Sequence, residues 1–425
     1  MPAVERTGAR GSSRSIAFAV LVAALGYFVD IYDLILFLIV RVKSLRGLGI
    51  PKEQILDKGV LLLNMQMIGM LAGGILWGVL GDKRGRVSVL FGSIFLYYVA
   101  TIANGFVHGV ADYAVLRLLA GIGLAGELGA GVTLVSEIMS RERRGWGTTV
   151  IAAIGLLGAV VASLVGAEFD WRVAYFVGGA LGLGLLLLRV GLYESGMFEG
   201  VKQKDVERGN FFRLFSHGPS LRRYLSIILV GMPIWFTLSI LVGLSPEMAK
   251  AMGMTAAVDP GRAVLFFYVG ASSGDFGSGF LSQMLRSRKK VLALFLFLTA
   301  SGIVVYFTWG RSSLTALYAC CGALGAATGY WAVFVTVASE QFGTNLRATA
   351  TTTVPNFVRG AVVPMTFVFQ SLKGPLGTVG SAASVAAATL VVAAIALFGL
   401  DETFGRDLDF VEADAPASAR AGEVL

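Results

Sequence analysis

The stretch Gly78-Val-Leu-Gly-Asp82-Lys83-Arg84-Gly85-Arg86 decides the fold, because it places a glycine-broken turn with four charged side chains between two long apolar segments. A soluble fold does not need such an arrangement, whereas two membrane helices must be joined by a polar turn outside the hydrocarbon. The flanking segments, near 59–80 and 87–107, each contain the roughly 20 residues that a membrane helix requires. The stretch therefore predicts two membrane helices joined by a short polar loop.

The composition of the whole chain supports a membrane protein. Of its 425 residues, 56% are apolar, only 15% are charged, and 55 are glycine. A soluble multi-domain protein does not have this balance. About twelve apolar windows are long enough to cross a bilayer. We expect an all-α membrane protein with spans near 16–40, 59–80, 87–107, 113–138, 147–169, 173–192, 224–247, 263–285, 291–310, 314–338, 350–371 and 377–400.

An internal repeat divides the chain into halves. A Ser-Glu pair followed seven residues later by arginine and a threonine-containing run occupies 136–149 and recurs at 339–352. The opening stretch has a counterpart at 279–283 with nearly the same spacing. Parallel repeats of this kind place a substrate site between them. We predict a tail at 1–14, a six-helix bundle at 15–192, a central loop at 193–223, a second six-helix bundle at 224–400 and a tail at 401–425.

These motifs resemble the major facilitator superfamily. The loop at 78–86 is similar to the family's signature between its second and third spans, and Arg117-Leu-Leu-Ala-Gly-Ile-Gly-Leu-Ala-Gly-Glu127 is similar to a second family motif. The pair Tyr32-Asp33 is similar to one found in the metabolite:proton and sugar-porter-like symporter branch of the family, and Asp30-Ile-Tyr-Asp33 also resembles the Asp-Gly-x-Asp of aromatic acid:proton symporters, with Ile31 in place of glycine. The resemblance implies twelve spans in two pseudo-symmetric bundles and secondary active transport by alternating access. It does not define the substrate.

Charged side chains inside the spans predict the proton path, because each is costly in hydrocarbon. Asp30 and Asp33 are three residues apart and lie within about 60° around a helix, so we expect them to face one cavity. The resemblance implies that Arg117 pairs with a first-span aspartate; a static buried ion pair is the alternative. Glu127 is either protonatable or in contact with substrate, or hydrogen-bonded to a neighbouring helix. The predicted proton-coupling residues are Asp30, Asp33, Arg117 and Glu127.

The second half has no matching acids and offers aromatic and polar side chains for substrate. Arg359 can hold a carboxylate in a two-pronged fork or be neutralised by Asp275, and both alternatives remain open. Asn64 and Gln66 point roughly 200° apart, so at most one faces the cavity well. The predicted substrate-binding residues are Asn64, Gln66, Trp235, Tyr330, Trp331, Asn356 and Arg359.

Charged residues at the loops predict a gate. The resemblance implies that Asp82 contacts the start of the eleventh span, and Glu340 is expected to pair with Arg347 or with the basic cluster at 286–290. Glu137 is expected to pair with nearby arginines. Such pairs are individually weak in water, which suits a gate that opens in every cycle. The predicted gate residues are Gly78, Asp82, Gly85, Arg86, Glu137, Arg144, Glu340 and Arg347.

The distribution of lysine and arginine predicts the orientation. Alternate loops are rich in them, which by the positive-inside rule places both termini in the cytoplasm. The loop after the first span is an exception, since it holds Arg41, Lys43, Arg46, Lys52 and Lys58. The net charge of +8 then reflects topology and contact with anionic lipids more than nucleic-acid binding. We expect a multi-pass protein of a bacterial inner membrane.

Enzymatic functions lack their parts in this sequence. There is no serine with a paired histidine and no Walker-type phosphate loop. Cys320 and Cys321 are adjacent on one predicted helix, and the two histidines, His108 and His217, stand alone, so no metal ligand set is present. We expect no enzyme activity, cofactor or metal, and a proton gradient as the energy source.

The first functional hypothesis is proton-coupled symport of a small organic anion or zwitterion. The alternative is proton-driven efflux of a metabolite or drug, although the fifth span has Gly155-Leu-Leu-Gly158 without the proline of drug:proton antiporters. A non-transporting nutrient sensor on the same fold is the third hypothesis. The expected partners are a small-molecule substrate, protons and membrane lipids, with no nucleic acid, and we expect a monomer.

Overall fold

The computed structural model describes residues 13–84, 86–126, 144–194 and 218–406. Within these ranges the protein is built from helices and contains no strand, as the composition predicts. The elements are α1 (Ser13–Gly47), η1 (Lys52–Gln54), α2 (Ile55–Arg84), α3 (Arg86–Asn104), α4 (Val110–Ala125), α6 (Arg144–Glu168), α7 (Trp171–Glu194), α9 (Gly218–Phe236), η3 (Thr237–Val242), α10 (Ser245–Ala251), α11 (Pro260–Met284), α12 (Arg288–Thr308), η4 (Gly310–Ser312), α13 (Leu314–Thr328), α14 (Trp331–Glu340), α15 (Thr344–Gly360) and α16 (Val362–Phe398).

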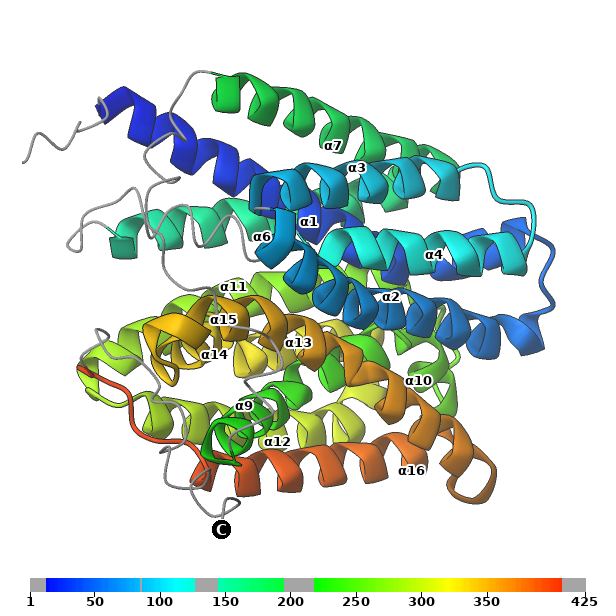
Figure 1. The fold of residues 1–425 in the computed structure, drawn as a ribbon. Coiled ribbons are helices and arrows are strands. Elements are labelled where there is room, and N and C mark those ends of the chain that lie inside the picture. The colour runs from blue at the N-terminus through cyan, green and yellow to red at the C-terminus, as the bar shows by residue number, and fades with distance from the viewer. Residues whose placement is uncertain (1–12, 85, 127–143, 195–217, 407–425) are drawn as a thin grey trace, which may run out of the picture.

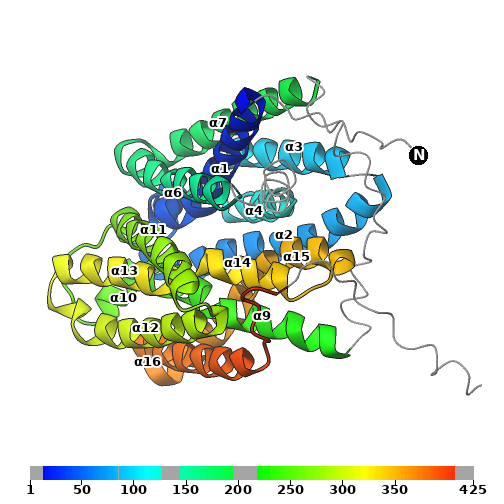
Figure 2. The same cartoon turned by 90° about the vertical axis from the view of Figure 1, so that its left-hand side faces the viewer.

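The helices form two groups that lie one above the other in Figure 1. Helices α1 to α7 form the first group and α9 to α16 the second. They meet where α2 packs on α15 and α6 packs on α11. Helix α1 begins and α16 ends at the same end of the molecule, which we call the terminal end; α1 ends at the opposite end (Figures 1 and 2).

Each group has a pair of helices in backbone contact, and glycine makes both contacts possible. A Cβ atom on Gly121 of α4 would lie 2.2 Å from the Gln66 carbonyl oxygen of α2. A Cβ atom on Gly325 of α13 would lie 1.9 Å from the Phe267 carbonyl oxygen of α11. Small residues let membrane helices approach this closely. The same packing in both groups agrees with the internal repeat.

Several expected spans differ from the observed helices. The first span continues to Gly47, so Arg41, Lys43 and Arg46 are helical and not part of a loop. The tenth span is broken between α13 and α14 at Gly329 and Tyr330. Helix α16 contains the end of the eleventh span and the whole of the twelfth, because Gly377 turns the chain between them with a φ of 67°, a conformation that glycine adopts without strain.

Several helices of the described residues are long and apolar enough to cross a membrane. Six helical stretches are long and apolar enough to cross a bilayer, and two further apolar helices, Phe91–Asn104 and Ile154–Glu168, are shorter. The protein is therefore an all-α membrane protein, as the sequence predicts.

Candidate functional site

Arg359 of α15 lies at the centre of the candidate site. Its side chain is 1% exposed. The guanidinium carbon lies 5.3 Å from the ring centre of Trp235 on α9 and 5.7 Å from that of Trp331 on α14. Its Nε and Nη1 atoms have no hydrogen-bond partner among the described residues. A buried guanidinium with unused donors is costly, so this site is suited to an anion that supplies the missing acceptors.

Asp275 of α11 does not neutralise Arg359. Both residues lie within the described ranges, and no ion pair joins them there. Instead, Asp275 Oδ1 accepts a hydrogen bond from the Ala332 amide in the first turn of α14, at 3.1 Å. The residue before that helix, Tyr330, provides no side-chain cap. Of the two alternatives for Arg359, the structural ion pair is therefore not found.

Helix α1 contributes a second set of groups to the same region. The hydroxyl of Tyr27 lies within electrostatic range of Arg359, Asp275 and Asp30. Side chains of α1, α11 and α15 therefore surround the candidate site. Asp30 is 3% exposed. The ring of Tyr27 packs against α6 at Gly155, where a Cβ atom would lie 1.9 Å from the ring. Gly155 therefore provides the space that Tyr27 occupies.

Asp33 lies further inside the first group. A Cβ atom on Gly178 of α7 would lie 2.1 Å from Asp33 Oδ1, so the carboxylate rests on that helix. Tyr97 of α3 experiences the charges of both Asp30 and Asp33. The two aspartates thus share a neighbour, while Asp30 also acts on Arg359.

Arg117 of α4 has a partner that the family resemblance did not name. Its Nη2 atom donates a hydrogen bond to Gln66 Oε1 of α2, and its guanidinium carbon lies 4.6 Å from the ring centre of Phe37. The contact of Gly121 with the Gln66 backbone holds α2 against α4, one turn after Arg117. Gln66 is therefore placed to satisfy Arg117.

Three other predicted substrate residues make contacts within the protein. Asn64 Oδ1 accepts from Thr366 Oγ1 of α16 at 2.8 Å. Asn356 Nδ2 donates to the Ala125 carbonyl oxygen of α4 at 3.1 Å. Both bonds join the two groups of helices. Tyr330, 0% exposed, donates to the Val230 carbonyl oxygen at 2.9 Å, which links two helices of the second group.

The predicted gate is only partly within the described structure. Glu340 of α14 pairs with Arg288 of α12, a member of the basic cluster at 286–290, at 3.3 Å. That pair lies within the second group. Gly85, Glu127 and Glu137 fall outside the described residues, and so do the surroundings of Gly78, Asp82, Arg86, Arg144 and Arg347.

The sequence reasoning missed an ion pair at the opposite end. Arg41 of α1 donates through both terminal nitrogens to Glu247 of α10, at 2.8 and 2.7 Å, and through Nη2 to the Gly243 carbonyl oxygen at 3.3 Å. Lys373 of α16 also pairs with Asp57 of α2, at 2.9 Å. Both pairs join the two groups. The excess of basic residues after the first span was the one feature of the sequence that could have indicated these pairs.

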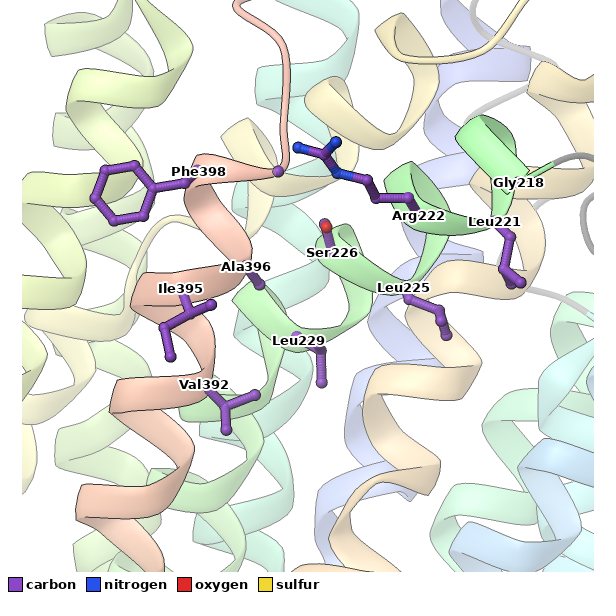
Figure 3. Close-up of a pocket in the computed structure, with 11 residues that line it drawn as sticks. Gly218, Leu221, Arg222, Leu225, Ser226, Leu229, Val392, Ile395, Ala396 and Phe398 are labelled. Carbon is purple, nitrogen blue, oxygen red and sulfur yellow. The ribbon is translucent and has the colours of Figure 1, made fainter.

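A separate groove of about 640 Å³ lies between α9 and α16 on the outer flank of the second group (Figure 3). Its walls include Leu225, Leu229, Val392 and Ile395, with Arg222 near its terminal end. None of the predicted substrate residues lines it. The groove is therefore distinct from the candidate site.

Comparisons with known proteins place the chain among transporters. A family model described as "Major Facilitator Superfamily" matches residues 16–362. The chain is 26% identical to the 3-(3-hydroxy-phenyl)propionate transporter of Escherichia coli, over 82% of this chain and 87% of that protein. It is 27% identical to the niacin transporter of Acinetobacter baylyi, over 68% and 72%. It is 22% identical to the benzoate transport protein of the same organism, over 75% of each.

Proposed function

The chain belongs to the Major Facilitator Superfamily, and we propose that this transporter carries a small organic carboxylate together with protons by alternating access. The observation that carries the proposal is the buried guanidinium of Arg359, held between Trp235 and Trp331 with two nitrogens lacking partners among the described residues. A carboxylate would satisfy those donors in a fork, and the indole rings would cover a flat substrate. The relatives named for niacin, benzoate and hydroxyphenylpropionate support a ring-bearing acid.

The acids of the first group supply the proton coupling in this proposal. Asp30 is close enough for its charge to act on Arg359, so a proton on Asp30 strengthens the attraction of the site for an anion. Asp33, Arg117 and Glu127 are the further proton-coupling candidates. Substrate recognition falls mainly to the second group, through Arg359 and the two tryptophans.

The ion pairs at the opposite end support a closed outer gate. By the positive-inside rule, we place the terminal end in the cytoplasm of a bacterial cell. Arg41–Glu247 then holds the two groups together on the outer side, where the exposed Lys373–Asp57 pair also joins them. Both pairs must separate before substrate can enter from outside. We propose that the transporter works as a monomer, with the site between its two halves.

The test is uptake into liposomes that contain a pH dye. With an inward proton gradient, benzoate or nicotinate should acidify the lumen, whereas uncharged nicotinamide should not. Arg359→Gln should abolish the signal, because the neutral amide cannot replace a guanidinium fork; Arg311→Gln, at an exposed surface position, is the matched control. Acidification that persists in Arg359→Gln would overturn the substrate assignment. Lumenal alkalinisation provoked by cations would point to export instead.

A further inference from the structure

The break in the tenth span lies directly against α11. Helix α13 ends at Thr328 and α14 begins at Trp331. A Cβ atom on Gly329, inside the break, would lie 2.5 Å from the Cα atom of Gly274. The two backbones therefore touch at this point. This contact places Asp275, the next residue of α11, beside the first turn of α14.

Asp275 supplies the cap that α14 lacks. Its Oδ1 atom accepts from the Ala332 amide at 3.1 Å, and the Trp331 amide also faces the carboxylate. A negative charge at a helix amino terminus is favourable, and a broken membrane helix exposes such a terminus inside the membrane. The side chain is half-buried, in contrast to Asp30 and Asp33, which are each 3% exposed.

The same turn of α14 forms part of the Arg359 site. Trp331, its first residue, covers the guanidinium at 5.7 Å, and Arg359 has two nitrogens without partners among the described residues. Among the described residues, the other titratable groups near this region include Tyr27 and Asp30 of α1 and Tyr268 of α11. A substrate carboxylate on Arg359 would therefore bring another negative charge close to both Asp275 and Asp30.

We propose that Asp275 is a second proton-carrying group, which couples substrate binding to movement of α14. The inference rests on the proposed function. A proton from the medium bonds to the Asp275 carboxylate as the substrate carboxylate binds Arg359, because the two like charges repel. The neutral acid is a weaker acceptor, so its hold on the Ala332 amide loosens and α14 can turn at Gly329. The proton returns to the medium on the other side when the substrate leaves.

Asp275→Asn resembles the protonated acid, because the amide is neutral and only a weak acceptor for the Ala332 amide, and it does not titrate. Helix α14 can then turn without a proton. We expect exchange of labelled benzoate between equal pools, which needs no net proton movement, to stay close to that of the wild type. Accumulation driven by a pH gradient should fall by roughly tenfold, which lies in the range of typical coupling energies. Asp275→Glu, which titrates, should restore part of the accumulation even if Asp275→Asn fails to insert.

The matched control is Asp259→Asn. Asp259 caps the start of α11 by accepting from the Gly261 amide at 2.8 Å, so this variant makes the same chemical change away from the site. It should exchange and accumulate like the wild type. Normal accumulation in Asp275→Asn, or equal loss of exchange and accumulation, would overturn the inference. Failure of every carboxylate to acidify the lumen with wild-type protein would instead overturn the proposed function.

Discussion

Arg41 and Glu247 form a two-pronged ion pair between helices that are far apart in the sequence, with donor–acceptor distances of 2.8 and 2.7 Å. The two side chains are 1% and 19% exposed. Gly59 of α2 leaves the space for the arginine, because a Cβ atom there would lie 2.6 Å from Arg41 Cδ. The pair thus joins α1 and α10 where the two groups meet at the opposite end.

Glu247→Gln should shift the transporter toward the state that is open at the opposite end. Removing one partner of a buried pair costs about 3–5 kcal/mol in the state that contains it, so the closed state loses more than the open one. The measurement is labelling of Leu38→Cys, a buried residue beside Gly243, by an impermeant maleimide in a background without Cys320 and Cys321. Labelling should become faster in Glu247→Gln.

Asp57→Asn is the control for that experiment. The Asp57 and Lys373 side chains are 59% and 30% exposed, and exposed pairs contribute about 0–1 kcal/mol. In the Asp57→Asn variant, the labelling rate of Leu38→Cys should therefore stay near the rate measured without that substitution. Equal rates in all three proteins would show that the Arg41 pair does not hold this end closed.

Trp235→Ala should weaken substrate binding more than Trp235→Phe. The guanidinium of Arg359 lies over this ring, and a cation–π contact contributes about 0.5–2 kcal/mol, which phenylalanine partly keeps. The apparent KM for uptake should rise from the wild type to Trp235→Phe and again to Trp235→Ala, at a similar protein level in the membrane. Trp309→Ala, an exposed position at the end of α12, is the control. If Trp235→Phe and Trp235→Ala raised the apparent KM equally, the aromatic ring face would make no contribution to substrate binding.

Gly121→Ala should prevent normal assembly of the first group. Its Cβ atom would lie 2.2 Å from the Gln66 carbonyl oxygen, so α2 and α4 must move apart and Gln66 must leave Arg117. The variant should give little monodisperse protein after detergent extraction. Gly184→Ala on α7 has no atom within 4 Å of the new Cβ, and it should be extracted like the wild type. Normal behaviour of Gly121→Ala would contradict the close packing of these helices.

Glu402 should make stability depend on pH at the terminal end. Burial acts against ionisation, but hydrogen bonds from Ser287 Oγ and from the Phe404, Arg288 and Lys289 amides lower the pKa of this carboxyl from 4.5 to about 2. A lowered pKa in the folded state means that the stabilisation is present above about pH 4.5 and is lost as the pH falls toward 2. Glu402→Gln should therefore lower the thermal midpoint at pH 7.

The pH dependence of that difference is the informative measurement. The thermal midpoints of the wild type and Glu402→Gln should converge as the pH is lowered from 7 to 3, because below about pH 4.5 the unfolded wild type takes up a proton at this carboxyl while the folded protein does not. Asp401→Asn is the neighbouring control, since the Asp401 side chain makes no hydrogen bond within the described residues. A difference that stays constant with pH would exclude ionisation as its cause.

The sequence could predict the fold because its signals are local or periodic. Span length, the loop at 78–86 and the repeated motif each depend on residues close together in the chain. Contacts between the groups are different, because they join residues hundreds of positions apart. Within the first group, the hydrogen bond of Arg117 to Gln66 joins residues 51 positions apart, and no local pattern indicated it. Arg359 was identified as a candidate, but its rings and its separation from Asp275 required the structure.

The loop charges show the same limit. The positive-inside rule counts lysine and arginine without regard to tertiary partners, so the residues after the first span were an exception to it. In the structure Arg41 binds Glu247, and Lys43 donates to the Gly166 and Ala167 carbonyl oxygens at the end of α6. Arg41 and Lys43 therefore have specific acceptors, which a count of loop charges does not consider.

The glycine contacts of α2 with α4 and of α11 with α13 also have an entropic consequence. Where backbone meets backbone, there are no rotamers to redistribute, so these contacts cannot absorb a rearrangement by changing side-chain populations. The interface of α2 with α15 is different, because Leu71 packs on Gly360 there and Asn356 packs on Gly74. Side chains at this interface can change rotamer when the halves move, so we expect the temperature dependence of the transport rate to respond to substitutions at Leu71 more than to conservative changes elsewhere on α2.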